Sequence, residues 1–445
     1  MSFAVRPSPL RPVNTVTLHV ERCAPNYCLT LGDRLCKINH NNVRFLIKIY
    51  YNVYVISPEN RSLDSLPLTR SQRRVLDAFK TDATFSCNAL ALHLGLTRTT
   101  VAGALKKLQK LRLIEQLPGT QGNSPVRGRP SLLYRLRVPT GFLGGITVGR
   151  RHICAGLANA NGELIETREE AVALGETAGA IAARGNRLLH DLLTTNSGTI
   201  ESILGIGLGL PGPIDTSSRI VTAKSVLPEW AGVDYLEMVH REFPVPLHVL
   251  NDATLGLIGE ANYGVAQGIE NVIYLKVSTG IGAGILTQGH VYMGGRGTAG
   301  EIGHIPTDPH GRICHCGCRG CLETVASIPA VLSSLDLVLG DNPTPQMLFD
   351  EYRRDNRSVV RAVHEAAREI GKAVSMMCNL LNPDMVILGG RMPTIGNDFT
   401  DTVTQVVQNT AIVPNGESVQ ITLPALHQRS EIYGAIHIAR QSLLP

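Results

Sequence analysis

The chain has 445 residues, of which 43% are hydrophobic and 18% charged, the balance of a soluble globular protein with enough material for two or three domains. It contains no apolar run long enough to span a bilayer and no recognisable signal peptide, so we expect a cytoplasmic protein without a membrane partner. Ten cysteines, four of them at ligand-like spacing, suit a reducing compartment better than a disulfide framework.

The net charge of +5 conceals an uneven distribution along the chain. Residues 69–137 contain 13 Lys and Arg against 3 Asp and Glu, whereas residues 138–445 contain 21 against 30. A small, strongly basic unit attached to a large acidic one predicts a nucleic-acid-binding head on a ligand-binding or catalytic body. A basic solvated face without a partner is the alternative on charge alone.

Residues 1–66 give no clear pattern. Several prolines near the start discourage regular structure, and the scattered cysteines show no ligand spacing. We leave this stretch unassigned and without a function, a disordered extension being one interpretation.

Residues 67–138 have the pattern of a winged helix-turn-helix domain. Apolar residues between 75 and 79 recur at three- and four-residue spacing and predict a first helix. Ser86 is placed to cap a second helix that Gly95 ends, and Thr97 is placed to cap a third. An extended segment, a loop rich in Gly, Pro and Arg, and a return strand then predict a hairpin, the wing.

The third predicted helix and the wing carry the candidate DNA contacts. These residues are Arg98, Thr99, Thr100, Lys106, Lys107, Arg127 and Arg129. The first three fall on the exposed N-terminal side of the helix, where base edges in a major groove are reached, and the lysines continue along it towards phosphates. The two wing arginines suit a minor groove, whose negative potential favours Arg. A winged domain used for protein contacts is the alternative, and the excess of basic residues argues against it.

From residue 141 onward the pattern changes to strands alternating with helices. Several of the predicted strands end in glycine-rich turns, which is how α/β proteins build ligand clefts. The expected strands cover residues 142–148, 153–158, 164–172, 203–210, 245–250, 272–277, 282–286 and 385–388, and helical spacing covers 178–193 and 359–381.

A short segment between residues 303 and 323 collects one histidine and several cysteines. One imidazole and three thiolates are the ligand set of a closed, tetrahedral structural zinc site, and the glycines between the last cysteines permit a tight turn. We predict that a structural Zn²⁺ is bound by His304, Cys314, Cys316 and Cys321. The single residue between the first two cysteines departs from the usual two, and Cys318 is left as a non-ligand.

The α/β region contains a series of motifs in order: Leu210-Pro211-Gly212-Pro213, Asn251-Asp252-Ala253, Ser278-Thr279-Gly280-Ile281-Gly282, Ala299-Gly300-Glu301-Ile302-Gly303-His304, the cysteine cluster, and Ile387-Leu388-Gly389-Gly390. Together they resemble the ROK family of bacterial sugar kinases and sugar-responsive transcriptional repressors. A winged helix-turn-helix ahead of such a body is similar to the xylose-repressor and N-acetylglucosamine-repressor branch.

The resemblance implies an α/β fold for residues 139–445, two-lobed and actin/hexokinase-like, built of ribonuclease-H-like halves. The first lobe is expected at about 139–250 plus the C-terminal helix, and the second at about 251–430. A sugar site is implied between them, with Asn251, Asp252, Glu301, His304 and Glu323 as the matching residues.

Two of these residues carry a specific role in the family. Asp252 matches the catalytic base of the kinases, and a carboxylate that accepts a hydroxyl proton suits phosphoryl transfer to an alcohol. His304 matches a residue with one ring nitrogen on zinc and the other directed at the sugar.

One kinase motif is degenerate. Kinases of the family open their body with Asp-x-Gly-Gly-Thr, which organises the nucleotide phosphates and magnesium, whereas this chain has Thr147-Val148-Gly149-Arg150-Arg151. Magnesium is usually held by a carboxylate and phosphates, and an Arg side chain would crowd the loop. The retained nucleotide-loop residues are Thr279, Gly280, Gly282, Gly389 and Gly390. We therefore expect the sugar site to persist and productive binding of ATP and Mg²⁺ to be lost.

The leading interpretation is a sugar-responsive DNA-binding transcriptional regulator, a repressor of carbohydrate-metabolism genes. Its expected partners are operator DNA and a small sugar effector, and a homodimer or larger oligomer is expected because such heads read paired half-sites. The alternative is an active ATP-dependent sugar kinase of the hexokinase type with a DNA-binding head. A regulator that senses a partner protein instead of a sugar is a third interpretation.

Overall fold

The structure is a computed structural model that describes residues 19–23, 26–31, 34–38, 68–79, 84–111, 113–117, 132–137, 139–173, 175–214, 233–441 and 443. The chain divides into two compact units, one containing Met1–Ala78 and Ser86–Leu108 and the other Phe79–Phe85 and Gln109–Leu444. Within the described ranges, no helix is long and apolar enough to cross a membrane.

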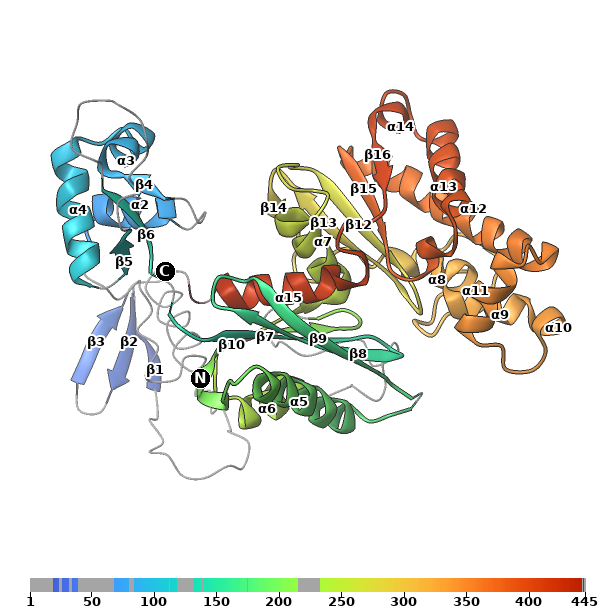
Figure 1. The fold of residues 1–445 in the computed structure, drawn as a ribbon, viewed down its shortest axis with the longest axis horizontal. Coiled ribbons are helices and arrows are strands. Elements are labelled where there is room, and N and C mark those ends of the chain that lie inside the picture. Colours follow the sequence, from blue (N-terminus) through green and yellow to red (C-terminus); the bar gives the residue numbers. More distant parts are fainter. Residues whose placement is uncertain are drawn as a thin grey trace. The chain divides into compact units, whose positions relative to one another are not determined.

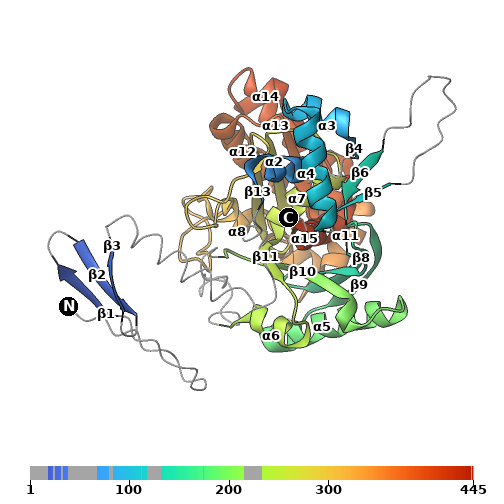
Figure 2. The same cartoon turned by 90° about the vertical axis from the view of Figure 1, so that its left-hand side faces the viewer.

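Three short strands pair near the N-terminus. They are β1 (His19–Cys23), β2 (Asn26–Leu31) and β3 (Arg34–Ile38), and they form an antiparallel sheet of their own (Figure 2). The sequence pattern does not predict these strands. The remainder of residues 1–66 lies outside the described residues.

Three helices follow, α2 (Arg70–Ala78), α3 (Cys87–Leu94) and α4 (Arg98–Lys110). The predicted caps are present. Ser86 Oγ accepts a hydrogen bond from the Ala89 amide at 3.1 Å, and Thr97 Oγ1 accepts one from the Thr100 amide at 3.2 Å. Gly95 ends α3 with a φ of 60°, a conformation that favours glycine. The buried side chains of the helices include Val75, Leu76, Leu90, Val101, Leu105 and Leu108.

The predicted hairpin strands are β5 (Ile114–Gln116) and β6 (Leu133–Leu136), which pair antiparallel with Ile114 opposite Leu136. A third short strand, β4 (Phe85–Ser86), lies on the other side of β6. The loop between β5 and β6, which carries Arg127 and Arg129, lies outside the described residues.

The first of two large sheets has five strands in the order β11-β10-β7-β8-β9. Strands β7, β8 and β9 form an antiparallel meander, while β10 and β11 run parallel to β7. Helices α5 and α6 lie against one face and α15 against the other (Figure 1). The bounds are β7 (Phe142–Val148), β8 (His152–Asn159), β9 (Leu164–Ala171), α5 (Ala178–Thr195), η3 (Ile200–Ser202), β10 (Ile203–Leu210), α6 (Tyr235–Glu242), β11 (Leu247–Asn251) and α15 (Ser430–Gln441).

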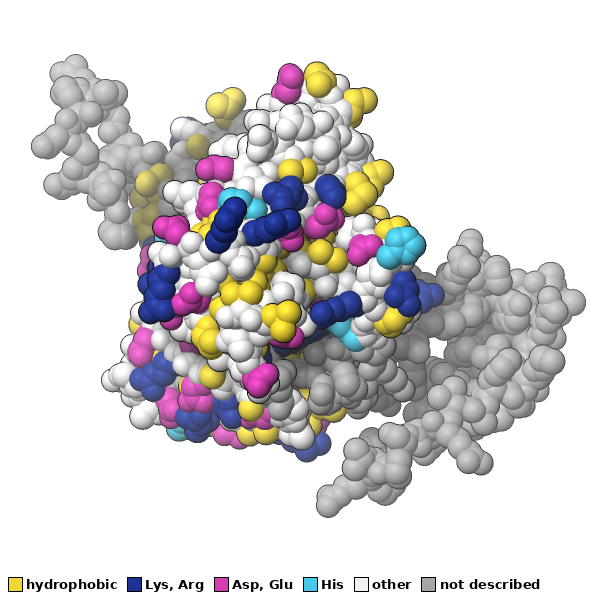
Figure 3. Space-filling view, turned by 90° about the vertical axis from the view of Figure 1, so that its right-hand side faces the viewer, with side chains coloured by type: hydrophobic (Ala, Val, Ile, Leu, Met, Phe, Trp, Pro, Cys, Tyr) yellow, Lys and Arg dark blue, Asp and Glu magenta, His cyan; other side chains and the backbone are white. Residues whose placement is uncertain are grey.

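The second large sheet also has five strands, in the order β14-β13-β12-β15-β16. Helix α7 packs on one face, and α12 and α13 form a large apolar core with the other. On the side of α9–α13, basic and acidic side chains are interspersed (Figure 3). The bounds of the sheet and its main helices are α7 (Asp252–Tyr263), β12 (Val272–Val277), β13 (Ile281–Thr287), β14 (His290–Val291), α12 (Arg357–Leu381), β15 (Met385–Gly389), α13 (Asn397–Thr410) and β16 (Gln420–Thr422).

Shorter helices lie in the segments that connect the elements of this second sheet. Their bounds are η5 (Ile302–His304), α8 (Glu323–Ala326), α9 (Ile328–Ser334), α10 (Asp336–Leu339), α11 (Pro345–Arg353), η6 (Met392–Ile395), α14 (Asn415–Ser418) and η7 (His427–Arg429). Of these, η5 and α8 matter for the site, because they place residues at the rim of a cavity.

Helices α7 and α15 pack against each other with their backbones in contact. A Cβ added at Gly259 of α7 would lie 2.0 Å from the Ser430 carbonyl oxygen, and one added at Gly434 of α15 would lie 2.0 Å from the Leu255 carbonyl oxygen. Glycine is therefore required at both positions, and the two helices fix the position of one large sheet relative to the other.

Candidate functional site

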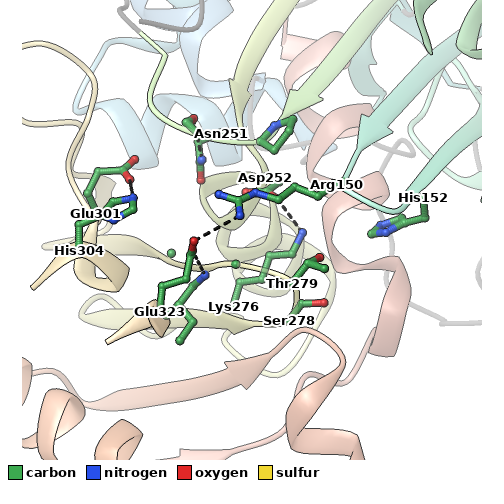
Figure 4. A pocket seen from close by; sticks show the side chains of 16 residues that line it. Arg150, His152, Asn251, Asp252, Lys276, Ser278, Thr279, Glu301, His304 and Glu323 are labelled. Carbon is green, nitrogen blue, oxygen red and sulfur yellow. Dashed lines mark hydrogen bonds and ion pairs between the residues drawn. The ribbon is translucent and has the colours of Figure 1, made fainter. Parts of the chain in front are cut away.

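A cavity open to solvent lies where both large sheets meet the N-terminus of α7 (Figure 4). Turns that follow β7, β10, β11 and β12 converge there, as expected for a ligand cleft in an α/β protein. The lining residues are Gly149, Arg150, His152, Pro211, Gly212, Asn251, Asp252, Lys276, Ser278, Thr279, Gly280, Ile281, Gly282, Glu301, His304 and Glu323. All five sequence-predicted sugar residues are therefore gathered in one cavity.

Asn251 and Asp252 are held by the start of α7. Asn251 is the N-cap: its Oδ1 accepts from the Ala253 amide at 2.9 Å, and its Nδ2 donates to the Gly212 carbonyl at 2.9 Å. Asp252 Oδ1 also accepts from the Ala253 amide, at 2.8 Å. The first turn of a helix has backbone amides without a partner in the helix, and side-chain oxygens bind to them. This preference places the side chains of both Asn251 and Asp252 at the start of α7.

Lys276 is a pocket residue that the sequence analysis missed. Its Nζ lies 2.7 Å from Asp252 Oδ2 and 2.7 Å from Glu431 Oε1, with only 9% of its side chain exposed. Burial by itself would lower the pKa of Lys276, but attraction to the two carboxylates and hydrogen bonds to them outweigh burial and raise it. The available signal was a lysine within the otherwise apolar strand β12.

Arg150, in the turn after β7, also faces the cavity and was not predicted as a site residue. One guanidinium nitrogen lies 3.3 Å from Glu323 Oε1, and another lies 3.5 Å from His315 Nε2. Glu323 Oε2 accepts from the Ile281 amide at 2.9 Å. The turn in which the kinases have glycine and threonine thus presents a guanidinium to a pocket carboxylate (Figure 4).

His152, the first residue of β8, fills further space beside the same turn. A Cβ added at Gly149 would lie 2.4 Å from the His152 ring, so the ring packs directly on the turn backbone. Burial lowers the pKa of His152, and the charge of Lys276 lowers it further. His152 is therefore neutral near pH 7 and adds bulk instead of charge to this end of the cavity.

Glu301 lies on the opposite rim, with Oε2 3.9 Å from His304 Nε2. Burial raises the pKa of Glu301 to about 7, the carboxylates of Asp252 and Glu323 raise it too, and Arg150 opposes the change. A carboxyl group in this range can either accept or donate a hydrogen bond to a ligand hydroxyl.

The four predicted zinc ligands lie together beside the cavity. Their donor atoms all lie within 4.8 Å of one another. Cys314 Sγ is 3.6 Å from His304 Nδ1, and Cys316 Sγ is 3.6 Å from Cys321 Sγ. Zinc–sulfur bonds of about 2.3 Å in a tetrahedron separate the sulfurs by about 3.8 Å. The cluster therefore fits a tetrahedral metal site, and Cys318, the fourth cysteine of this loop, lies outside the group.

A glycine lets this cysteine loop close. Gly320 has a φ of 65°, and a Cβ there would lie 1.6 Å from the Asp308 carbonyl oxygen. His304 turns Nδ1 to Cys314 and Nε2 to Glu301. One imidazole thus contacts both the thiol cluster and the cavity.

The remaining predicted residues fall in three places. Thr279, Gly280 and Gly282 line the cavity, whereas Gly389 and Gly390, at the end of β15, are not among its described lining residues. On α4, Arg98, Thr99, Thr100 and Lys106 are exposed and Lys107 is half-buried.

Residues 143–442 match the ROK family model, and the chain belongs to the ROK family. A putative xylose repressor of Caldicellulosiruptor sp. (strain Rt8B.4) is 29% identical over 330 residues, which are 71% of this chain and 82% of that protein. A glucokinase of Thermotoga maritima is 26% identical over 315 residues, 67% of this chain and 97% of that protein.

Solved structures show the same fold. A ROK family transcriptional regulator, a homologue of the Escherichia coli MLC protein, superposes with a TM-score of 0.69 at 21% identity and covers 84% of this chain and 96% of its own. A ROK glucokinase from Streptomyces griseus, solved with glucose and AMPPNP, has a TM-score of 0.58 at 25% identity and covers 68% of this chain and 100% of its own. The predicted α/β class and two-lobed body are confirmed.

Proposed function

We propose that this protein is a sugar-responsive DNA-binding transcriptional regulator, a repressor of carbohydrate-metabolism genes. The named relatives include xylose repressors, and the regulator structure matches 84% of this chain where the glucokinase structure matches 68%. The exposed basic and hydroxyl side chains of α4 are the proposed DNA contacts, together with Arg127 and Arg129 of the wing. A homodimer is proposed because helix-turn-helix heads usually read paired half-sites.

One observation carries the choice of a receptor over a kinase. Arg150 stands where the kinases have a small phosphate-loop residue, and its guanidinium is paired with the cavity carboxylate of Glu323. A sugar bound to Asn251, Asp252, Glu301 and Glu323 would retain its hydrogen-bond partners, because carboxylates accept from several hydroxyls. Nucleotide phosphates and magnesium would meet Arg150 and His152 instead of a carboxylate and glycines.

The proposal includes a structural zinc ion held by His304, Cys314, Cys316 and Cys321. Such an ion would order the loop that leads into α8, whose first residue is Glu323, and would orient the imidazole that faces Glu301. The zinc ion would not contact the sugar, which would bind to side chains of the protein. A metal content of one zinc per chain in purified protein is expected, and a metal-free protein of undiminished stability would contradict this part.

The function is tested by a thermal-shift screen with D-xylose, D-glucose and N-acetyl-D-glucosamine, followed by DNA binding. A sugar that binds the native state raises the melting temperature by mass action. Fluorescence anisotropy with DNA from upstream of the coding sequence should then show binding that the same sugar changes. Lys106→Ala should weaken DNA binding, whereas Lys372→Ala on α12 is the matched surface control. A protein that binds no DNA at low salt would refute the proposal.

An active sugar kinase is the second candidate, because the Asn251-Asp252 pair and its cavity are intact and glucokinases are among the relatives. A coupled ADP-release assay with the same sugars decides between the two. ATP-dependent turnover that Asp252→Asn abolishes would favour the kinase.

A further inference from the structure

A buried three-residue charge cluster connects the cavity to the C-terminal helix. Lys276 of β12 donates to Asp252, the first residue of α7, and to Glu431, in the first turn of α15, at 2.7 Å in each case. The three side chains are only 9%, 14% and 13% exposed. One ammonium group thus serves two carboxylates from two different helices.

Both oxygens of Asp252 are engaged. Oδ2 accepts from Lys276, and Oδ1 accepts from the Ala253 amide at 2.8 Å. An ammonium group at hydrogen-bond distance favours the ionised form of a carboxylate and so opposes the transfer of a proton to it. A carboxylate oxygen has two lone pairs, so the same oxygens can still accept hydrogen bonds from ligand hydroxyls.

Lys276 is the main positive charge that balances the carboxylates of Asp252 and Glu431. Burial raises the pKa of Glu431, while Lys276 lowers it and Asp252 raises it. The other titratable or charged groups that face the cluster are His152 and Cys154 of β8, Tyr274 of β12, Glu301 of the rim, and Glu169 and Arg391 further out. Burial raises the pKa of Cys154 to about 12, so this thiol brings no charge near pH 7.

We propose that Lys276 is a positioning residue that holds Asp252 as a fixed, ionised hydrogen-bond acceptor for a sugar and prevents it from acting as a base. The inference rests on the proposed function, because it assigns Asp252 to the binding of a neutral sugar. Removing the ammonium group leaves two buried carboxylates without a shared cation, and such a pair takes up a proton near neutral pH. A protonated carboxyl group is a weaker acceptor than a carboxylate.

The first test measures the affinity of D-glucose and D-xylose by calorimetry at pH 6 and pH 8.5. Wild-type affinity is the reference at each pH, because burial raises the pKa of Glu301 to about 7 and this cavity carboxyl group changes its protonation between the two values in every variant. Lys276→Met should bind about tenfold more weakly at pH 6 and recover towards pH 8.5, since a hydrogen bond to a charged group is stronger by about that factor. The double variant Lys276→Met/Glu431→Gln removes the competing carboxylate and should restore the pH profile of wild type. A Lys276→Met protein with wild-type affinity at both values overturns the proposal.

The second test uses unfolding and requires no sugar. The shared proton of Lys276→Met raises the pKa of the pair in the folded state, so the stability that it contributes is lost as pH rises through that value. The variant should therefore lose more stability between pH 6 and pH 8.5 than wild type does, and Glu431→Gln should reverse this loss. If none of the three sugars of the thermal-shift screen binds any of these proteins, the proposed function fails, while an unaltered pH dependence of unfolding overturns the present inference. If neither the single nor the double variant folds, Lys276 is merely structural and the inference is wrong.

Discussion

Glu260, near the C-terminal end of α7, is fully buried and accepts four hydrogen bonds. Oε2 accepts from the amides of Val265 at 2.9 Å and Ala425 at 3.1 Å. Oε1 accepts from the Leu426 amide at 3.0 Å and from Ser430 Oγ at 2.7 Å. One carboxylate therefore joins the end of α7 to the segment that enters α15.

Glu260→Gln is the sharpest perturbation of this joint, because it conserves shape and changes the hydrogen-bonding groups. The glutamine carbonyl can still accept hydrogen bonds from two of the four donors. Its NH₂ group faces the other two donors and gives them no acceptor. Each buried donor left without an acceptor costs about 1–3 kcal/mol. Two of them should therefore lower the free energy of unfolding by about 2–6 kcal/mol.

The assay is urea unfolding followed by circular dichroism, compared with the exposed control Glu270→Gln, which should match wild type within about 0.5 kcal/mol. The loss should appear in the midpoint and not in the slope of the transition, because the folded core is otherwise unchanged. If Glu260→Gln were as stable as wild type, water or other groups would have to satisfy these donors, and the proposed joint would not exist.

Three further predictions concern the metal loop, the head and the helix pair. Cys316→Ser should release zinc and lower the melting temperature, whereas Cys318→Ser should retain one zinc per chain in metal analysis. Arg98→Ala should weaken DNA binding about tenfold and leave sugar-induced thermal shifts intact, measured by anisotropy at constant salt. Gly434→Val should destabilise the body by about 3 kcal/mol or more in urea unfolding, because its side chain would meet the Leu255 carbonyl; a smaller loss would mean that α15 can move away from α7.

Much of the fold could be predicted from the sequence because its signals are local. A strand is predicted at residues 142–148, and β7 occupies these residues. A short apolar run between glycine-rich turns favours a buried strand. The caps at Ser86 and Thr97 depend on side chains bonding amides three residues away. The cysteine cluster was found for the same reason, because three of its four ligands lie within eight residues.

The missed residues depend on contacts between distant segments. Lys276 and Glu431 are far apart in sequence, and only the crossing of α7 and α15 brings Glu431 to the ammonium group. Arg150 departs from the kinase motif, but its pairing with Glu323 depends on the fold that brings the turn after β7 to the start of α8. The sequence pattern can reveal a charged residue within an apolar strand, but it cannot identify the residue that pairs with it.

The charge cluster links a residue of the cavity to helix α15, which packs on strand β7. Glu431 lies in the first turn of α15, and the far part of this helix packs Ile436 and Ala439 against Leu143 of β7. Strand β7 begins at Phe142, shortly after β6 of the hairpin ends at Leu136. Helix α15 therefore contacts the cavity residue Lys276 at one end and the strand that follows the hairpin at the other. A ligand that changes the hydrogen bonds of Asp252 acts on the same ammonium group that holds α15. Because α15 also packs on α7 through backbone contacts, the ammonium group of Lys276 and the two glycines together hold these helices to each other.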